Sequence, residues 1–284
     1  MMLKGRIINI NSSNYTVIAK DKKYVCTVRG VFREKKVTPL VGDNVVINVK
    51  DSQIIEILKR KNQLQRPSVA NIDMSLIMVS VKKPNLDLLL LDKLLVHSLA
   101  SKITPIICFT KCDLLNDDEY EKIKEIKKYY KKIGFEVIEN TEISYFKKLV
   151  SGKTVVCAGQ TGSGKSTFIN KIDSTLDLKT APISKALGRG VHTTRLNSIY
   201  KVDDFYIVDT PGFSALDFDN IDKEVIKDCF IEFNNYTCKY TGCYHINIDG
   251  CGIEGNKNIL PSRYKNYKRF IKEKDESSSK FFKK

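Results

Sequence analysis

Apolar and polar residues alternate with the short period of β-strands over the first 58 residues of the chain. Five such runs are separated by polar turns, and they cover residues 5–10, 15–19, 23–30, 44–50 and 53–58. An open meander of this size would leave its edges unpaired, so the pattern predicts a small closed barrel of the five-stranded OB type. Such barrels commonly present a basic face to nucleic acid, and a barrel used only for packing is the alternative.

The pattern changes near residue 72. Residues 74–81 form a nearly continuous apolar run, as expected for a strand of a parallel sheet that is covered on both faces. Further strands are predicted at 104–109, 135–139, 153–159, 197–202 and 205–210, with helices at 86–100 and 117–132 between them. Alternating strands and helices indicate an α/β doubly wound sheet.

Beyond about residue 218 the sequence predicts a small helical region. Residues 223–233 have a helical pattern, a cluster of cysteines follows, and residues 261–273 form a second, basic helix. Residues 274–284 are polar and terminal, so we expect them to fray.

Charge is concentrated at the two ends of the chain. The 284 residues carry a net charge of +15. Residues 1–66 hold 14 Lys and Arg against 5 Asp and Glu, residues 261–284 hold 9 against 3, and the middle is balanced. Basic flanks favour a polyanion partner, although a general bias of the genome toward lysine would give the same count.

Membrane attachment and secretion are not indicated. No apolar run reaches the roughly 18 residues of a membrane helix. The first ten residues are too polar for a secretory signal. We therefore expect a cytoplasmic protein.

A phosphate-binding loop is predicted where a strand meets a helix. The segment GQTGSGKST fits the P-loop pattern, and its members are Gly159, Gln160, Thr161, Gly162, Ser163, Gly164, Lys165, Ser166 and Thr167. Its glycines allow backbone amides to face the phosphates. Lys165 would reach the β- and γ-phosphates, and the hydroxyl of Ser166 would bind Mg²⁺.

Two later segments supply the remaining phosphate-side chemistry. Asp209 begins a DTPG segment, where it can hold magnesium through water, and the amide of Gly212 can meet the γ-phosphate. Between the two motifs, Thr193 or Thr194 in LGRGVHTTR would cap the magnesium when a γ-phosphate is present. His192 beside them could order the attacking water, although a lone loop histidine more often only faces solvent.

A base-reading corner is predicted at the end of the strand 104–109. Thr110, Lys111, Cys112 and Asp113 belong to the class N/T-K-x-D. The Asp113 carboxylate can accept from N1–H and the exocyclic amine of guanine, which adenine lacks, so it would select GTP. In an ordinary GTPase this corner follows the phosphate loop. Here it precedes it, and joining residue 212 to residue 74 restores the usual order, so we expect a circularly permuted domain.

Four residues near the carboxyl end form a candidate zinc site. Three of the eight cysteines and one histidine occur close together: Cys238, Cys243, His245 and Cys251. Three thiolates and one imidazole complete a closed tetrahedral set, which is typical of one structural Zn²⁺ and leaves no open catalytic position. Unligated core cysteines are the alternative.

These motifs together resemble the ribosome small-subunit-dependent GTPase A family, also called RsgA, YjeQ or EngC. The likeness rests on RPSVANID at 66–73, the phosphate loop, GRGVHTT, DTPGF, the spacing C-x4-C-x-H-x5-C and RYKNY at 263–267. It implies an N-terminal OB-type barrel (1–66), a circularly permuted P-loop GTPase domain (67–218) and a C-terminal helical zinc-binding domain (219–284). It also implies a factor that acts late in maturation of the small ribosomal subunit, contacts its rRNA and hydrolyses GTP to GDP faster when the subunit is bound. We expect a monomer.

The chain departs from the family pattern at several positions. Thr110 stands where the family usually has Asn, the base-side loop at 139–144 does not match, and Ile248 and Asp249 replace a Glu-Pro pair. Phe213 follows DTPG, where many GTPases have a water-positioning Gln. The resemblance therefore favours His192 for that role.

Two other functions remain compatible with the sequence. The protein could be an RNA-binding module whose nucleotide signals occupancy without turnover, or a P-loop ATPase that holds RNA with its basic flanks. Phosphate release with and without small subunits distinguishes the first, and competition of GTP by ATP distinguishes the second.

Overall fold

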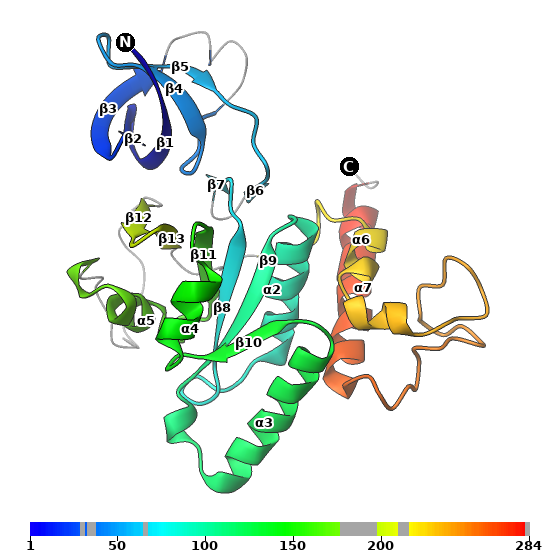
Figure 1. Ribbon diagram of the computed structural model, residues 1–284. Helices are drawn as coiled ribbons and strands as arrows, with labels where there is room; N and C mark the ends of the chain where they lie inside the picture. Colours follow the sequence, from blue (N-terminus) through cyan, green and yellow to red (C-terminus); the bar gives the residue numbers. More distant parts are fainter. Residues whose placement is uncertain (29–31, 33–37, 65–67, 177–197, 210–215, 282–284) are drawn as a thin grey trace, which may run out of the picture. The chain divides into compact units, whose positions relative to one another are not determined.

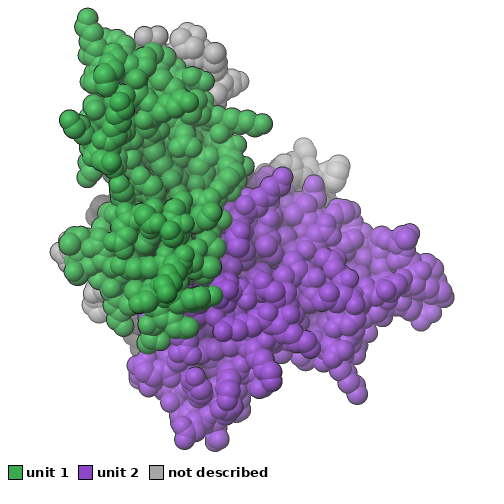
Figure 2. Space-filling model, viewed as in Figure 1, with its two compact units in different colours: residues 1–76, 141–213 green, residues 77–140, 214–284 purple. Residues whose placement is uncertain are grey.

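The computed structural model describes residues 1–28, 32, 38–64, 68–176, 198–209 and 216–281 (Figure 1). The chain divides into two compact units, and each contains two separate stretches of sequence (Figure 2). Unit 1 consists of residues 1–76 and 141–213, and unit 2 consists of residues 77–140 and 214–284. No helix in the described part of the chain is long and apolar enough to cross a membrane.

Unit 1 begins with a closed five-stranded barrel (Figure 1). Its strands are β1 (Met2–Asn11), β2 (Asn14–Ala19), β3 (Lys22–Val28), β4 (Asn44–Asn48) and β5 (Gln53–Ile57). They pair in the order β1-β2-β3-β5-β4, and β4 pairs back with β1. The residues that alternate inward, including Ile7, Val17 and Ile47, fill the interior. The predicted barrel is thus confirmed.

The rest of unit 1 carries the phosphate loop. It contains the short pair β6 (Gln63–Leu64) and β7 (Val69–Ala70), then α4 (Ile143–Leu149), β11 (Thr154–Gly159), α5 (Lys165–Ile172), η2 (Ser174–Leu176), β12 (Ser198–Val202) and β13 (Phe205–Asp209). Strand β13 is parallel to β11 and antiparallel to β12. Strand β1 of the barrel also pairs with β12, at Asn9 and Ser198. The barrel and the phosphate half therefore share a sheet.

Unit 2 holds the half of the α/β fold in which base reading is predicted. Strand β8 (Met74–Ser80) begins in unit 1 and ends in unit 2, where it is followed by α2 (Leu88–Ala100), β9 (Thr104–Thr110), η1 (Cys112–Leu114), α3 (Asp117–Lys132) and β10 (Glu136–Glu139). The strands lie in the order β10-β9-β8, and β10 is parallel to β9. A capping box starts α3, with Asn116 and Glu119 bonding reciprocally, and basic residues end it.

The C-terminal elements pack on α2 within the same unit. They are α6 (Lys223–Asp228), η3 (Ile231–Asn235) and α7 (Pro261–Phe281). Buried aromatic rings of Phe218, Phe230, Phe233, Tyr267 and Phe270 form their common core, which also includes Val96 of α2.

Two predicted helices have different bounds in the structure. The helix predicted at 223–233 ends at Asp228, because the chain turns there to bury Phe230 and bring Glu232 to Arg263. The last helix continues to Phe281 through residues that we expected to fray. Helix α4 and the pair β6–β7 were not predicted, since each is too short to show a period.

Candidate nucleotide site and metal centre

The phosphate loop lies between β11 and α5, as the sequence predicts. Gly164 precedes the first helical residue with φ of +90°, a conformation that side-chain-bearing residues rarely adopt. Lys165 Nζ donates to the carbonyl oxygens of Gly159 and Gln160, at 2.8 Å each. The ammonium thus lies against the loop, where a P-loop lysine meets the β- and γ-phosphates.

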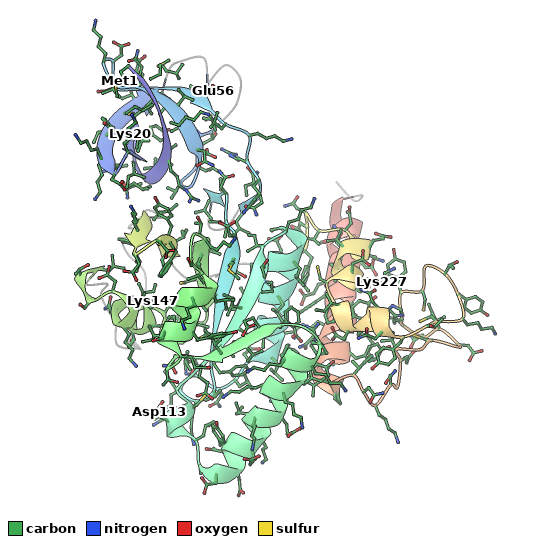
Figure 3. The ribbon with its side chains drawn as sticks, in the orientation of Figure 1. Met1, Lys20, Glu56, Asp113, Lys147 and Lys227 are labelled. Carbon is green, nitrogen blue, oxygen red and sulfur yellow. The ribbon has the colours of Figure 1, made fainter. Side chains whose placement is uncertain are left out.

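The base-reading corner lies at the carboxyl end of β9. Thr110 is the last residue of that strand and is buried, with its hydroxyl 3.5 Å from Val79 O. Lys111 has φ of +62°, and its Nζ donates to Lys83 O. Asp113 follows in η1 with an exposed side chain (Figure 3). Open α/β folds bind ligands at the carboxyl edge of the parallel sheet, and the carboxylate of Asp113 lies at that edge.

The two halves of the predicted nucleotide site belong to different units. Residues 159–167 are in unit 1, and residues 110–113 are in unit 2. Four other predicted residues, His192, Thr193, Thr194 and Gly212, lie outside the described residues, as does the side chain of Asp209. Their roles stay predictions.

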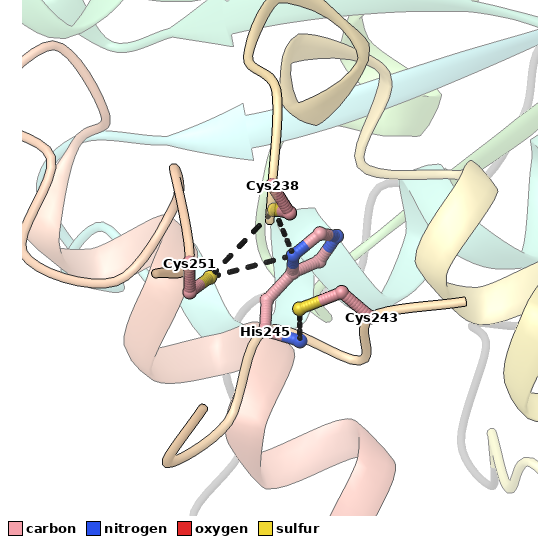
Figure 4. Close-up of side chains that lie close together, drawn as sticks. All are labelled: Cys238, Cys243, His245 and Cys251. Atoms are coloured by element: carbon pink, nitrogen blue, oxygen red, sulfur yellow. Dashed lines mark hydrogen bonds between the residues drawn. The ribbon is translucent and has the colours of Figure 1, made fainter. Parts of the chain in front are cut away.

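The Cys/His cluster is brought together in full. The ligand atoms of Cys238, Cys243, His245 and Cys251 all lie within 4.8 Å of one another (Figure 4). His245 Nδ1 is 3.4 Å from Cys238 Sγ and 3.6 Å from Cys251 Sγ, and the two sulfurs are 3.9 Å apart.

The distances among Cys238, His245 and Cys251 fit three corners of a tetrahedral zinc site, and Cys243 Sγ lies within 4.8 Å of them. With Zn–S of about 2.3 Å and Zn–N of about 2.0–2.1 Å, the edges of a regular tetrahedron are about 3.8 Å between sulfurs and about 3.6 Å between sulfur and nitrogen. Backbone amides also point at the sulfurs, from His245 to Cys243 and from Gly252 to Cys238, at 3.3 Å each. Such donors stabilise thiolates. Burial lowers the pKa of His245, which favours the neutral imidazole that binds metal.

Helix α7 holds the loop that carries these ligands. The hydroxyl of Tyr264 donates to His245 O at 2.6 Å, and that of Tyr267 donates to Tyr244 O at 2.7 Å. Gly252 has no room for a side chain, since a Cβ would lie 2.3 Å from Thr237 O. The loop is therefore fixed both by its own backbone and by the helix.

Unit 2 also contains a buried ionic network that was not predicted from the sequence. Arg263 of α7 is fully buried and donates to Glu232 at 2.8 and 2.9 Å and to Asp92 of α2 at 2.8 Å. Tyr130 and Asn266 also donate to Asp92, at 2.6 Å each. Burial alone would lower the pKa of Arg263, but the two carboxylates raise it above its ordinary value. The available signal was Asp92, an acid within the apolar run of residues 86–100 that does not lie at the start of the helix as Asp87 does.

A P-loop on an α/β fold, together with a five-stranded barrel and a Cys/His cluster, is typical of a multidomain nucleotide-binding protein of the P-loop class. A family model described as RsgA GTPase matches residues 57–219, and one described as RsgA N-terminal domain matches residues 4–54. A protein of Oceanobacillus iheyensis named small ribosomal subunit biogenesis GTPase RsgA 2 is 44% identical, over 96% of this chain and 97% of that protein.

Two solved structures are similar over nearly the whole chain. The crystal structure of YjeQ from Thermotoga maritima has a TM-score of 0.83 and 29% identity, and covers 96% of this chain and 99% of that one. YloQ, described as a circularly permuted GTPase, has a TM-score of 0.82 and 32% identity, over 97% and 96% of the two chains. The chain belongs to the RsgA family of GTPases. It is accordingly a GTP-hydrolysing enzyme, and membership implies a guanine nucleotide with Mg²⁺.

Proposed function

We propose that this GTPase acts in biogenesis of the small ribosomal subunit. It binds the subunit and its rRNA in the GTP state, hydrolyses GTP at a late step of maturation, and leaves after hydrolysis. The observation that carries the proposal is the phosphate loop, with Lys165 held against Gly159 and Gln160, on a chain 44% identical to a named small-subunit biogenesis GTPase. Such a factor works in the cytoplasm, and we propose that it does so as a monomer.

The nucleotide site is proposed to use both motifs. Residues 159–167 bind the phosphates, residues 110–113 bind guanine, and the amide of Gly212 meets the γ-phosphate. Ser166 and Asp209 hold Mg²⁺, together with Thr193 or Thr194. Magnesium supplies charge neutralisation at the β- and γ-oxygens when it is bound.

His192 is the proposed water-positioning residue, because Phe213 has no polar group to offer. His192→Ala should lower subunit-stimulated hydrolysis by about 100-fold, in the range of a lost general base, with little change in nucleotide affinity. Full stimulated activity in that variant would remove His192 from the mechanism and leave the GTPase assignment intact.

The remaining modules have separate roles in this proposal. Residues 1–66 are the proposed rRNA-binding barrel, residues 67–218 the GTPase domain and residues 219–284 the zinc-binding domain. The family models match residues 4–54 and 57–219, which supports separate N-terminal and GTPase modules. The Cys/His cluster holds one structural Zn²⁺, which the tetrahedral distances support.

The decisive experiment measures GTP hydrolysis with and without purified small subunits. We expect slow turnover alone and marked acceleration by small subunits, with large subunits as the control. Subunit binding should be tight with a non-hydrolysable GTP analogue and weaker with GDP. Equal affinity in both nucleotide states, or equal stimulation by large subunits, would contradict the proposal.

A further inference from the structure

A lysine with little solvent exposure lies beside the base-reading corner in unit 2. Lys127 belongs to α3, and its side chain is 13% exposed. Its Nζ donates to Glu139 Oε1 at 2.5 Å and to Cys112 Sγ at 3.4 Å. Cys112 lies between Lys111 and Asp113 of the corner, and Glu139 is the last residue of β10. One ammonium group therefore connects the corner to the end of the neighbouring strand.

These contacts reinforce a connection that the backbone already makes. Glu139 lies opposite Phe109 in the parallel register of β10 and β9, and the amide of Asn140 donates to Phe109 O at 3.1 Å. Lys127 Nζ is 5.4 Å from the centre of the Phe109 ring. The lysine thus contacts both strand ends just where their loops begin.

A second lysine of α3 is solvent-exposed and serves as a comparison for Lys127. Lys124 has a side chain that is 58% exposed, and it pairs with Glu121 of the same helix at 2.9 Å. Burial of Lys127 alone would lower its pKa, whereas Glu139 and Cys112 raise it, so the ammonium stays charged in its site. A half-buried ammonium needs well-placed partners to offset its loss of hydration, and Glu139 and Cys112 are those partners here.

We propose that Lys127 is a positioning residue for guanine recognition. By holding Cys112 and Glu139, it fixes the corner that carries Asp113 against the end of β10. The inference rests on the proposed role of residues 110–113 in binding guanine. The sequence supplies a reason for this additional support: a Thr110 hydroxyl offers one donor and an acceptor oxygen, whereas an Asn amide would offer two donors and an acceptor.

The test compares guanosine and inosine diphosphates on the full-length protein. Inosine lacks the exocyclic amine that the Asp113 carboxylate accepts from, so the ratio of the two dissociation constants reports the geometry at Asp113. Losses of phosphate binding or of overall stability affect both nucleotides and cancel in the ratio.

Lys127→Met removes the charge and keeps most of the stem. We expect its GDP dissociation constant to rise about tenfold, and its preference for guanosine over inosine to fall at least about threefold. Lys127→Arg should recover most of that preference, because it restores a donor for Glu139 and Cys112. Lys124→Met, on the same helix, should behave as wild type.

The outcomes separate this inference from the proposed site. Unchanged guanosine preference in Lys127→Met overturns the positioning role, even if the melting temperature falls. If Lys127→Met does not fold, Glu139→Gln weakens the same contact from the other side and must show the same loss of preference. Asp113→Asn is measured in parallel: if it retains the wild-type preference, the base-reading assignment itself is wrong.

Discussion

The barrel and the C-terminal helix are both basic in sequence, but the barrel lysines and Arg263 of the helix occupy different environments. The barrel lysines are exposed, namely Lys4, Lys20, Lys22, Lys23 and Lys50 (Lys20 is labelled in Figure 3). In α7, by contrast, Arg263 is 0% exposed and is enclosed by two carboxylates. A count of charges along a segment therefore describes its surface only where the side chains reach solvent.

The exposed cations of α7 are also partly neutralised within the helix. Arg269 pairs with Glu273 at 3.0 Å, and Lys272 lies 3.8 Å from Glu276. We therefore expect polyanion binding mainly at the barrel lysines. Arg263, by contrast, ties α7 to Asp92 and Glu232, and the same helix holds the loop of the Cys/His cluster.

Loss of the metal should have the largest effect, and only in the C-terminal region. Cys243→Ser removes one of four ligands, and structural zinc contributes on the order of 10 kcal/mol in small zinc domains. We expect metal analysis to fall from one zinc per chain toward none, and amide hydrogens beyond about residue 220 to exchange faster, with the barrel unchanged.

The control for this prediction is Cys229→Ser. Cys229 is buried in the same unit, and its Sγ lies 3.6 Å from Val96 O, outside the cluster. This variant should keep its zinc. Wild-type protein that contains no metal after gentle purification would disprove the zinc assignment.

The second largest effect should come from Arg263→Met. It leaves Asp92 and Glu232 buried without their cation, which lowers the free energy of unfolding by about 3–5 kcal/mol. Denaturant unfolding measures this loss. Arg269→Met on the exposed face of the same helix should change stability by less than about 0.5 kcal/mol.

A rescue variant separates the ionic network from simple packing. Adding Asp92→Asn and Glu232→Gln to Arg263→Met removes the unpaired charges, so part of the stability should return. Equal losses in Arg263→Met and Arg269→Met would mean that the two cations of α7 do not differ, contrary to the structure.

The contrast between these regions was only partly visible in the sequence. The barrel was predictable because apolar and polar residues alternate along each strand, and the strands follow one another in the sequence with short polar turns between them. The Cys/His cluster was predictable because Cys238, Cys243, His245 and Cys251 are close in sequence and form a specific ligand set. Local signals of this kind need no knowledge of the tertiary fold.

Arg263 was not predictable as a buried residue. It occurs among lysines in a basic helix, and its partners Asp92 and Glu232 lie 171 and 31 residues away in the chain. Lys127 is hidden for the same reason, in a helix whose neighbouring lysines are solvated. Tertiary contacts decide whether a charged side chain is buried, whereas the composition gives only the number of charged residues.

The third largest effect should appear in the salt dependence of binding to the small ribosomal subunit. Changing Lys4, Lys22 and Lys23 of the barrel to Gln should reduce the salt slope of small-subunit binding by about three, since each phosphate contact contributes about one. Changing Lys268, Arg269 and Lys272 of α7 should reduce it by less, because two of these already have carboxylate partners. Equal reductions would show that intrahelical pairing does not shield α7, and an unchanged slope in both would mean that neither surface binds phosphate.

The smallest effect should come from acid, through His97 of α2, which packs beside the C-terminal elements. The pKa of His97 is lowered to about 4, chiefly by burial and also by Lys93, while Asp217 opposes the shift. The ring stacks on Phe218 at 5.3 Å, and Lys93 pairs with Glu273 of α7. The barrel, residues 1–66, contains no histidine.

Because the folded pKa of His97 lies below its ordinary value of 6.5, the unfolded chain takes up a proton first as the pH falls. Stability is therefore lost between pH 7 and pH 4, and the part due to His97 amounts to roughly 1.2 kcal/mol by pH 5.5. His97→Gln cannot gain that proton, so its free energy of unfolding should fall less than that of wild type over the same interval. Protonation of the metal ligands and of the carboxylates occurs in both proteins and cancels in the comparison. Equal pH dependence in the two proteins would show that the His97 imidazole stays accessible to protons, and that the contact with Phe218 does not exclude them.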